Sequence, residues 1–384
     1  MAIRIRFKLS SKKGIVLILF TFMGILGIFY RILITVKLKK SHHIRKLRNV
    51  TMLSLLNYLL MPITIRCLVP AILGRRANKD ENRIELIKEF STYDMRKAEA
   101  DDKTLLFNGT NAKILTRQIR LYCISLTMEK DLTTKAKAVK DTWAKRCTKH
   151  FFIVTSNIKL PGFISLDIED KRATLIPKML SALQFVYRNY IDKFDWLLKT
   201  DDDTYVIVEN LRLLLSNYNG SKPAYMGYHF NKFVSNGYMS GGAGYVISNS
   251  ALRQFLEMGI NKQKCKIGME SNVELAEDIE IGNCLSELKV PILNSTDMFG
   301  KETFHPYHLK QHVLGPLPSY LHEWSQNRPQ EGPMCCSQYS ISFHYVQPSD
   351  MYVLDHLLYR TSVYGIQQSL LGSKTFFPKH SNQG

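Results

Sequence analysis

Apolar runs of strand length alternate with amphipathic stretches through the middle of the chain. Residues 121–126 and 151–154 are almost uninterrupted apolar runs, which is typical of buried strands. In residues 135–145 and 175–190 the apolar positions recur at helical spacing instead. Buried strands that alternate with helices indicate an α/β fold with a mainly parallel central sheet.

The alternation continues toward the carboxyl terminus. Further strand-like runs and helical stretches are expected at residues 194–198, 208–218, 246–247 and 251–258. We assign residues 116–362 to one folded domain and residues 363–384 to a C-terminal tail. The sequence contains no internal repeat and no low-complexity segment.

Ahead of this domain lies an apolar stretch of the length that a membrane span needs. Residues 14–36 carry one charge, Arg31, whose long side chain can reach the membrane surface. No small-residue cleavage site follows, which disfavours a cleaved signal peptide. We predict a cytosolic tail (1–13), a transmembrane signal anchor (14–36) and a stem (37–115).

Two features complicate the orientation of this anchor. Basic residues lie on both of its sides, and a second apolar stretch, residues 50–73, is interrupted by Pro62 and Arg66. The second stretch is either a stem segment that dips into the membrane or the true anchor, with the basic loop held in the cytosol. We predict a single-pass type II protein whose carboxy-terminal domain is luminal.

The charge of the chain is concentrated near this apolar sequence. The formal net charge is +19, yet 16 of the 52 basic residues precede Asp80, the first acidic residue. The remainder carries 36 basic and 33 acidic residues and is nearly balanced. The basic excess therefore suits a membrane surface, and we do not expect nucleic-acid binding.

Cysteines and glycosylation motifs indicate an oxidising lumen. Acceptor tripeptides begin at Asn108, Asn219 and Asn294, and a fourth at Asn49 lies too near the predicted membrane span to count. The folded domain holds an even number of cysteines, whose pairing the spacing leaves open: Cys123, Cys147, Cys265, Cys284, Cys335 and Cys336. Metal binding by Cys335 and Cys336 would need further soft ligands, because the CxxC spacing that is typical of zinc sites is absent. Cys67 remains in the stem, either as a free thiol or as a link between chains.

An acidic triplet follows the apolar run at residues 194–198. Asp201, Asp202 and Asp203 repel one another, so their adjacency is costly unless a cation compensates it. Carboxylate oxygens suit Mn²⁺ or Mg²⁺, with other positions left to a diphosphate. A plain surface turn is the alternative. Because ligands of α/β sheets bind at the carboxyl ends of strands, the triplet is a candidate site.

Two further segments carry candidate chemistry. Gly241 and Gly242, in a glycine-rich turn, would let the backbone approach a ligand and donate N–H groups, or would simply allow a tight connection. Glu277 and Asp278 open an expected helix, where acids are ordinarily caps. One of them is alternatively a base that activates a sugar hydroxyl.

Histidine and aromatic residues complete the candidates. His344 lies in an aromatic strand and is either core or, beside Asp203, a metal ligand. Aromatic faces stack on sugar rings, and the candidates for such a pocket, each also explicable by packing, are Tyr225, Tyr228, His305 and Trp324.

In order and number, these segments resemble the core 1 β1,3-galactosyltransferases of inverting glycosyltransferase family 31. The matching sequences extend from Cys123 to Tyr359: KAK at 135–137, TWAKRC at 142–147, TDDDTYV at 200–206, YMSGGAGYV at 238–246, ED at 277–278, ETFHP at 302–306, EGP at 331–333, CCS at 335–337 and SFHYV at 342–346.

This resemblance implies a GT-A fold in the catalytic domain and a metal-dependent activity in the Golgi lumen. UDP-galactose would be the donor, Mn²⁺ the metal, and O3 of N-acetylgalactosamine on Ser or Thr of a glycoprotein the acceptor. It also suggests a homodimer. Two alternatives remain: a family 31 β1,3-glycosyltransferase with another donor or acceptor, and a non-catalytic chaperone of the same fold.

Residue roles follow from the resemblance by position. The metal motif would consist of Asp201 and Asp203, with Asp203 and His344 as protein ligands. Asp202 and Thr127 would lie near the nucleotide, and Asp278 would be the general base, with Glu277 the less favoured neighbour.

The resemblance also implies two disulfides, Cys123 with Cys147 and Cys265 with Cys284. Cys335 and Cys336 are left to a vicinal bond or to other partners. The sequence departs from the family at residues 307–310 and 321–329, which bears on the acceptor side of the site.

Overall fold

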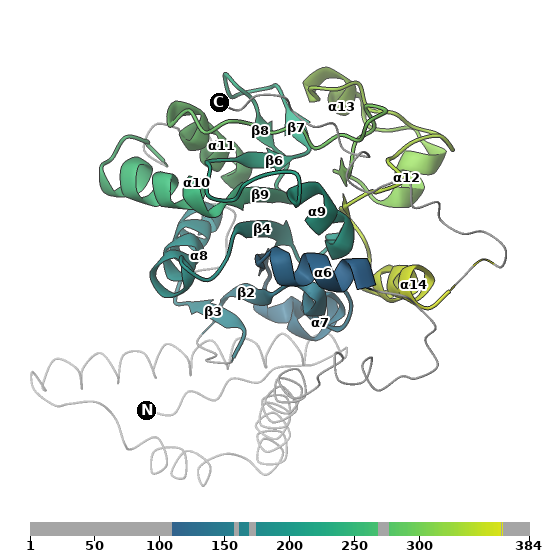
Figure 1. Cartoon of the computed structure of the whole chain (residues 1–384), viewed down its shortest axis with the longest axis horizontal. Coiled ribbons are helices and arrows are strands. Elements are labelled where there is room, and N and C mark those ends of the chain that lie inside the picture. The colour runs from purple at the N-terminus through teal and green to yellow at the C-terminus, as the bar shows by residue number, and fades with distance from the viewer. Residues whose placement is uncertain (1–109, 157–160, 169–173, 268–275, 362, 364–384) are drawn as a thin grey trace, which may run out of the picture. The chain divides into compact units, whose positions relative to one another are not determined.

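The computed structural model describes residues 110–156, 161–168, 174–267, 276–361 and 363 (Figure 1). Among these residues no helix is both long enough and apolar enough to cross a lipid bilayer. The predicted cytosolic tail, the anchor (14–36), the second apolar stretch (50–73) and most of the stem lie outside the described residues, as does the tail after residue 363.

A six-stranded sheet forms the centre of the described domain, in the order β3-β2-β1-β4-β9-β6. Its strands are β1 (Leu121–Leu126), β2 (Lys149–Thr155), β3 (Phe163–Leu166), β4 (Trp196–Asp201), β6 (Tyr225–Gly227) and β9 (Tyr245–Ser248). The first four run parallel, and β9 is antiparallel to both β4 and β6. The expected α/β fold with a mainly parallel sheet is confirmed, and it is compatible with a GT-A fold.

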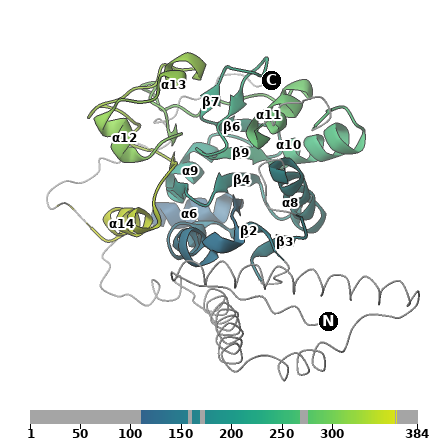
Figure 2. The ribbon, with the colours of Figure 1, turned by 180° about the vertical axis from the view of Figure 1, so that it is seen from behind.

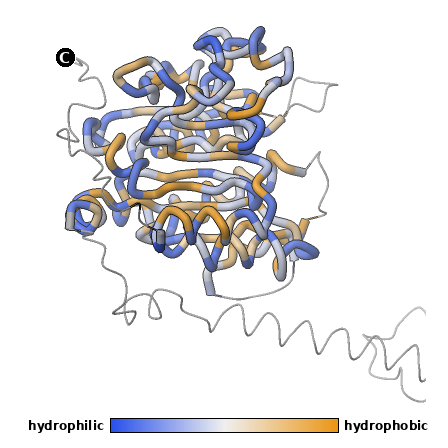
Figure 3. The backbone as a smooth tube through the Cα atoms, turned by 90° about the vertical axis from the view of Figure 1, so that its right-hand side faces the viewer, coloured by the Kyte–Doolittle hydropathy of each residue, from blue (hydrophilic) through white to orange (hydrophobic). Residues whose placement is uncertain are grey.

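Helices cover both faces of this sheet because alternate strand residues point to opposite sides. One face packs against α8 (Leu175–Tyr190), α10 (Asn249–Gln254) and α11 (Glu277–Glu287). The other packs against α7 (Lys137–Asp141), α9 (Val208–Leu215) and α14 (Pro348–Tyr359). Figures 1 and 2 show α8 and α10 on one side and α9 on the other, and Figure 3 shows apolar residues recurring along the chain within the layers.

Several helices differ from their expected bounds. The stretch expected as one helix at 135–145 is a π-helical turn (Leu132–Ala136), α7 and a 3₁₀ turn (Ala144–Arg146). Helix α7 ends where the Thr142 hydroxyl donates to the Ala138 carbonyl at 2.6 Å, and Trp143 turns into the core. Helix α10 continues as a π-helical turn (Phe255–Asn261). Helix α6 (Thr110–Gln118) packs beside α9 and overlaps the end of the predicted stem.

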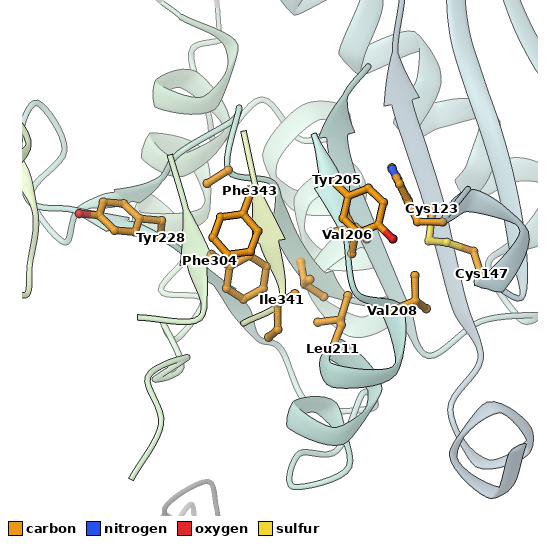
Figure 4. Close-up of a cluster of buried hydrophobic side chains, with 14 of the residues drawn as sticks. Cys123, Cys147, Tyr205, Val206, Val208, Leu211, Tyr228, Phe304, Ile341 and Phe343 are labelled. Atoms are coloured by element: carbon orange, nitrogen blue, oxygen red, sulfur yellow. A yellow bond between two sulfur atoms is a disulfide. The ribbon is translucent and has the colours of Figure 1, made fainter. Parts of the chain in front are cut away.

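A second, three-stranded sheet links distant parts of the chain. It contains β5 (Tyr205–Val206), β10 (Phe304–His305) and β11 (Ser342–Phe343), with β11 in the middle. Figure 4 shows apolar side chains of these strands, among them Tyr205, Phe304 and Phe343, gathered in one buried cluster. Strand β5 directly follows the acidic triplet and pairs antiparallel with β11, so residue 344 lies opposite the triplet.

The remaining elements lie around these sheets. They are a two-stranded sheet of β7 (His229–Phe230) and β8 (Tyr238–Met239), a 3₁₀ turn (Glu129–Asp131), and helices α12 (Leu309–Leu314) and α13 (Ser319–Trp324).

Two disulfides connect elements of the domain. Cys123 is bonded to Cys147 and Cys265 to Cys284, which confirms both expected pairs. Cys335 and Cys336 are thiols whose sulfur atoms lie 2.7 Å apart.

A buried ion pair attaches α14 to the rest of the domain and generates a stability prediction. Asp355 accepts a 2.7 Å hydrogen bond from Arg146 and one of 3.3 Å from the Tyr205 hydroxyl, and both ion-pair side chains are largely buried. Asp355→Ala leaves the guanidinium without its main counter-charge, so unfolding should become easier by about 3–5 kcal/mol. Chemical denaturation of the purified protein measures this difference.

The control is the exposed pair of Asp192 and Arg253. Asp192→Ala should change the free energy of unfolding by less than about 1 kcal/mol. Equal losses from the two variants would contradict the role assigned to Asp355.

Candidate active site

A cleft of about 590 Å³ opens at the carboxyl ends of β1 and β4. It is the place where ligands of α/β sheets bind. All the residues predicted for metal binding, nucleotide binding and general-base catalysis line it. Two lysines and a tyrosine that the sequence reasoning did not select line it as well, and the full set is Thr127, Lys178, Lys199, Asp201, Asp202, Asp203, Gly241, Gly242, Glu277, Asp278, His344 and Tyr345.

Three of these residues form a group able to hold a metal ion. One ligand atom each from Asp201, Asp203 and His344 lies within 4.8 Å of the others. His344 Nε2 is 3.2 Å from Asp203 Oδ1 and 3.8 Å from Asp201 Oδ2. The backbone fixes this approach, because the Val346 N–H donates to the Asp203 carbonyl at 2.9 Å.

The donor set fits a divalent cation such as Mn²⁺ or Mg²⁺. Neighbouring ligands of an octahedral ion with bonds of about 2.1 Å lie about 3 Å apart, close to the Asp203–His344 separation. Burial opposes the charge of Asp203, but its hydrogen bond and charge interaction with His344, together with Lys135, lower its pKa to about 2. The carboxylate is therefore ionised at neutral pH, as a metal ligand must be.

The middle acid of the triplet faces a different set of partners. The Thr127 hydroxyl donates to Asp202 Oδ2 at 2.7 Å, and Lys135 Nζ is 3.5 Å from Oδ1. Burial raises the pKa of Asp202, whereas the hydrogen bond from Thr127 and the charge of Lys135 lower it. The effect of burial is larger, and the pKa is raised to about 6. The buried Lys178 ammonium donates to the Thr127 carbonyl at 2.7 Å. Thr127 and Asp202, both expected near the nucleotide, are thus brought together.

Lys199 joins the triplet to the helix that carries the candidate base. Its ammonium is 3.0 Å from Asp201 Oδ1 and 3.1 Å from Glu277 Oε2, and the residue is 3% exposed. Burial alone would lower the pKa of Lys199, but the neighbouring carboxylates outweigh it and raise the pKa. The sequence does carry a signal for this role of Lys199, because a lysine is unusual within an apolar strand. It also lies two residues before Asp201, and therefore on the same side of β4.

Glu277 and Asp278, at the start of α11, have separate environments. Glu277 is 5% exposed and accepts a 2.6 Å hydrogen bond from the Tyr245 hydroxyl in addition to its pairing with Lys199. Within the described residues, Asp278 accepts hydrogen bonds from the backbone N–H of Gly241 at 2.7 Å and of Ile279 at 3.0 Å. Burial raises the pKa of Asp278, which strengthens it as a proton acceptor near neutral pH.

Gly242 allows close packing against His344, and Gly241 allows close packing against Asp278. A Cβ at Gly242 would lie 2.1 Å from the nearest atom of the His344 ring, and one at Gly241 would lie 3.1 Å from Asp278 Oδ2. The Gly242 carbonyl also accepts a 2.7 Å hydrogen bond from the Thr204 hydroxyl. A side chain at position 242 would displace the histidine.

The structure favours packing, the alternative to a sugar pocket, for the aromatic candidates. Tyr225, Tyr228 and His305 are at most 2% exposed and line no part of the cleft, so their faces cannot stack on a sugar. Trp324 packs on Phe230 and Phe233 instead. The spacing of aromatic residues does not distinguish core from cleft. Tyr345, which was not selected, is the tyrosine in the cleft wall and stacks on His344.

A second group of potential metal ligands includes one of the adjacent cysteines, Cys336. Ligand atoms of His305, His312 and Cys336 lie within 4.8 Å of one another. His305 already shares a hydrogen bond with Ser340 at 3.1 Å, and none of the three residues lines the cleft. This group is separate from the site built around the acidic triplet.

Comparisons with known proteins agree with this geometry. The chain matches the Fringe-like protein family over residues 123–355. It is 36% identical over 257 residues to glycoprotein-N-acetylgalactosamine 3-beta-galactosyltransferase 1 of Xenopus laevis, covering 66% of this chain and 70% of the relative. It is 28% identical over 173 residues to beta-1,3-glucosyltransferase of Mus musculus, covering 44% of this chain and 34% of that protein. Its identity to chondroitin sulfate synthase 3 of Homo sapiens is 24% over 189 residues, covering 43% of this chain and 20% of that protein.

The fold, the acidic cleft and these similarities define a glycosyltransferase. The chain belongs to the Fringe-like family, within glycosyltransferase family 31. The match to the Xenopus protein confirms the resemblance to the core 1 β1,3-galactosyltransferases and the expected class of enzyme, a galactosyltransferase.

The close approach of Gly242 to His344 generates a prediction about metal binding. Gly242→Ala should push the imidazole away from the acidic triplet and weaken Mn²⁺ binding by roughly 10–100-fold, as other changes around metal ligands do. Electron paramagnetic resonance of free Mn²⁺, titrated with protein in the presence of UDP, measures the affinity.

Gly300→Ala serves as the control. Its positive φ makes the substitution strained, but nothing lies within 4 Å of the added methyl group. If both variants bound Mn²⁺ as tightly as the unmodified protein, the fit of Gly242 against His344 would have no part in metal binding.

Proposed function

We propose that the chain transfers galactose from UDP-galactose to O3 of N-acetylgalactosamine on Ser or Thr of glycoproteins. The observation that carries this proposal is that the candidate metal group and Asp278 line the same cleft. The printed activity of the Xenopus relative supports the choice of sugars and linkage.

Asp201, Asp203 and His344 are the residues that would hold the metal, for which we propose Mn²⁺. When bound, such a cation offsets the negative charge that develops on the departing UDP. Thr127 and Asp202 would contact the nucleotide part of the donor, and the backbone at Gly241 and Gly242 would pass close to it.

Asp278 is the better candidate for the general base. Glu277 is buried and already engaged by Lys199 and Tyr245, whereas the hydrogen bonds of Asp278 within the described residues come from backbone N–H groups and Asp278 lines the cleft. Its carboxylate would take the proton of the acceptor hydroxyl as that oxygen attacks the anomeric carbon. Direct displacement from the opposite face converts an α-linked donor into a β-linked product without a covalent enzyme intermediate.

The cellular setting belongs to the same proposal. The apolar stretch 14–36, the sequons and the two disulfides support a single-pass type II protein of the Golgi membrane with a luminal catalytic domain. A homodimer stays a prediction from the family resemblance.

Two alternatives have distinct support. Similarity to a beta-1,3-glucosyltransferase favours a family 31 enzyme with another donor or acceptor. A non-catalytic chaperone of the same fold would have no need of the complete Asp201, Asp203 and His344 group, whose presence favours an enzyme.

A donor panel tests the proposed activity. The purified full-length chain, with a GalNAc-bearing peptide and several UDP-sugars, should transfer galactose only. EDTA should abolish the transfer and Mn²⁺ should restore it, because the proposed leaving group needs its charge offset. Nuclear magnetic resonance of the product identifies the linkage. Transfer of another sugar would favour the first alternative, and no metal-dependent UDP release from any donor would favour the chaperone.

The two acids of α11 provide the test of mechanism. Asp278→Asn should lower kcat by about 10²–10⁴-fold, the usual contribution of a general base, while UDP binding stays nearly unchanged. Glu277→Gln should lower kcat less, because it removes a partner of Lys199 and not the proton acceptor. Steady-state kinetics and calorimetric UDP titration measure both. A normal kcat in Asp278→Asn would exclude this residue as the base.

A further inference from the structure

An apolar groove of about 1030 Å³ runs between α12 and α14. Leu309 and Leu314 on α12, Pro316 in the following turn, and Val353 and Leu354 on α14 contribute its apolar walls. Figure 1 shows these two helices on the same side of the described domain. The groove is therefore built from the last third of the chain.

This groove adjoins the catalytic cleft. Tyr345 lines both, and its ring stacks on His344 with centroids 3.8 Å apart. The next residue, Val346, lines the groove and donates its N–H to the Asp203 carbonyl. A molecule in the groove would thus lie directly beside the candidate metal group.

The exposed apolar side chains of the groove have no structural explanation within the described residues. Leu314 is 70% exposed and Val353 is 56% exposed. Their burial would stabilise a complex, and contiguous apolar surfaces of this kind mark binding sites. The lining includes one lysine, Lys310, and one carboxylate, Asp350, so the groove has little net charge.

We propose that this groove binds the polypeptide of the acceptor glycoprotein, next to the residue that carries the sugar. The inference rests on the proposed function. Tyr345 lines both the groove and the cleft, so a polypeptide segment in the groove would reach the cleft at this residue. The ligand class is an uncharged, proline-containing segment in an extended conformation, because apolar and aromatic grooves recognise such segments at low entropic cost.

The test compares two acceptors with the full-length chain and its Leu314→Asp and Val353→Asp variants. One acceptor is a GalNAc-threonine peptide with flanking prolines, and the other is a simple alkyl glycoside of GalNAc. Each variant should raise KM for the glycopeptide at least about tenfold relative to KM for the alkyl glycoside. Fluorescence anisotropy of the labelled glycopeptide should show the same loss of binding, independent of turnover.

Met334→Asp is the matched control, because Met334 is 76% exposed but lies outside the groove. It should leave the ratio of the two KM values unchanged. An unchanged ratio in the Leu314 and Val353 variants, with normal glycopeptide binding, would overturn the proposal. A change in the molar mass of these variants, measured by light scattering, would also overturn the proposal, because it would show that the groove binds a second copy of the chain. Failure of the unmodified protein to transfer galactose to either acceptor would instead reject the proposed function.

Discussion

Charge compensation at the end of β4 is the constraint on which the site depends. Asp201, Asp203 and Glu277 lie in one partly buried cleft, where uncompensated carboxylates would repel one another and lose hydration. Lys199 pairs with two of them, and His344 approaches the third. The same contacts that offset the charge also fix the positions of the groups that the chemistry needs.

Long-range strand pairing supplies the geometry for this compensation. The acidic triplet ends β4 of the large sheet, whereas His344 follows β11 of the small one. The short antiparallel pairing of β5 with β11 brings the two together across more than a hundred residues of sequence. Sequence order and family resemblance predicted these residues as one group, and the folded chain shows that they meet.

Local patterns predicted the fold better than they predicted the site. The apolar runs at β1 and β2 and the amphipathic α8 have strong periodicity, and their positions are confirmed. Lys199 was missed because a single charged residue in a strand does not reveal which carboxylates surround it. Tyr225 and Tyr345 have the same side chain, yet one is core and the other lines the cleft. That difference depends on tertiary packing, which no short segment encodes.

The disulfide between Cys265 and Cys284 has a practical implication for producing this protein. Cys284 lies on α11, the helix whose first turn carries Asp278, and Cys265 anchors that helix to the segment after α10. Expression in a reducing cytosol would remove both this tether and the bond between Cys123 and Cys147. Because the two disulfides form under oxidising conditions, a secretory host is the appropriate source of protein in which α11 is tethered.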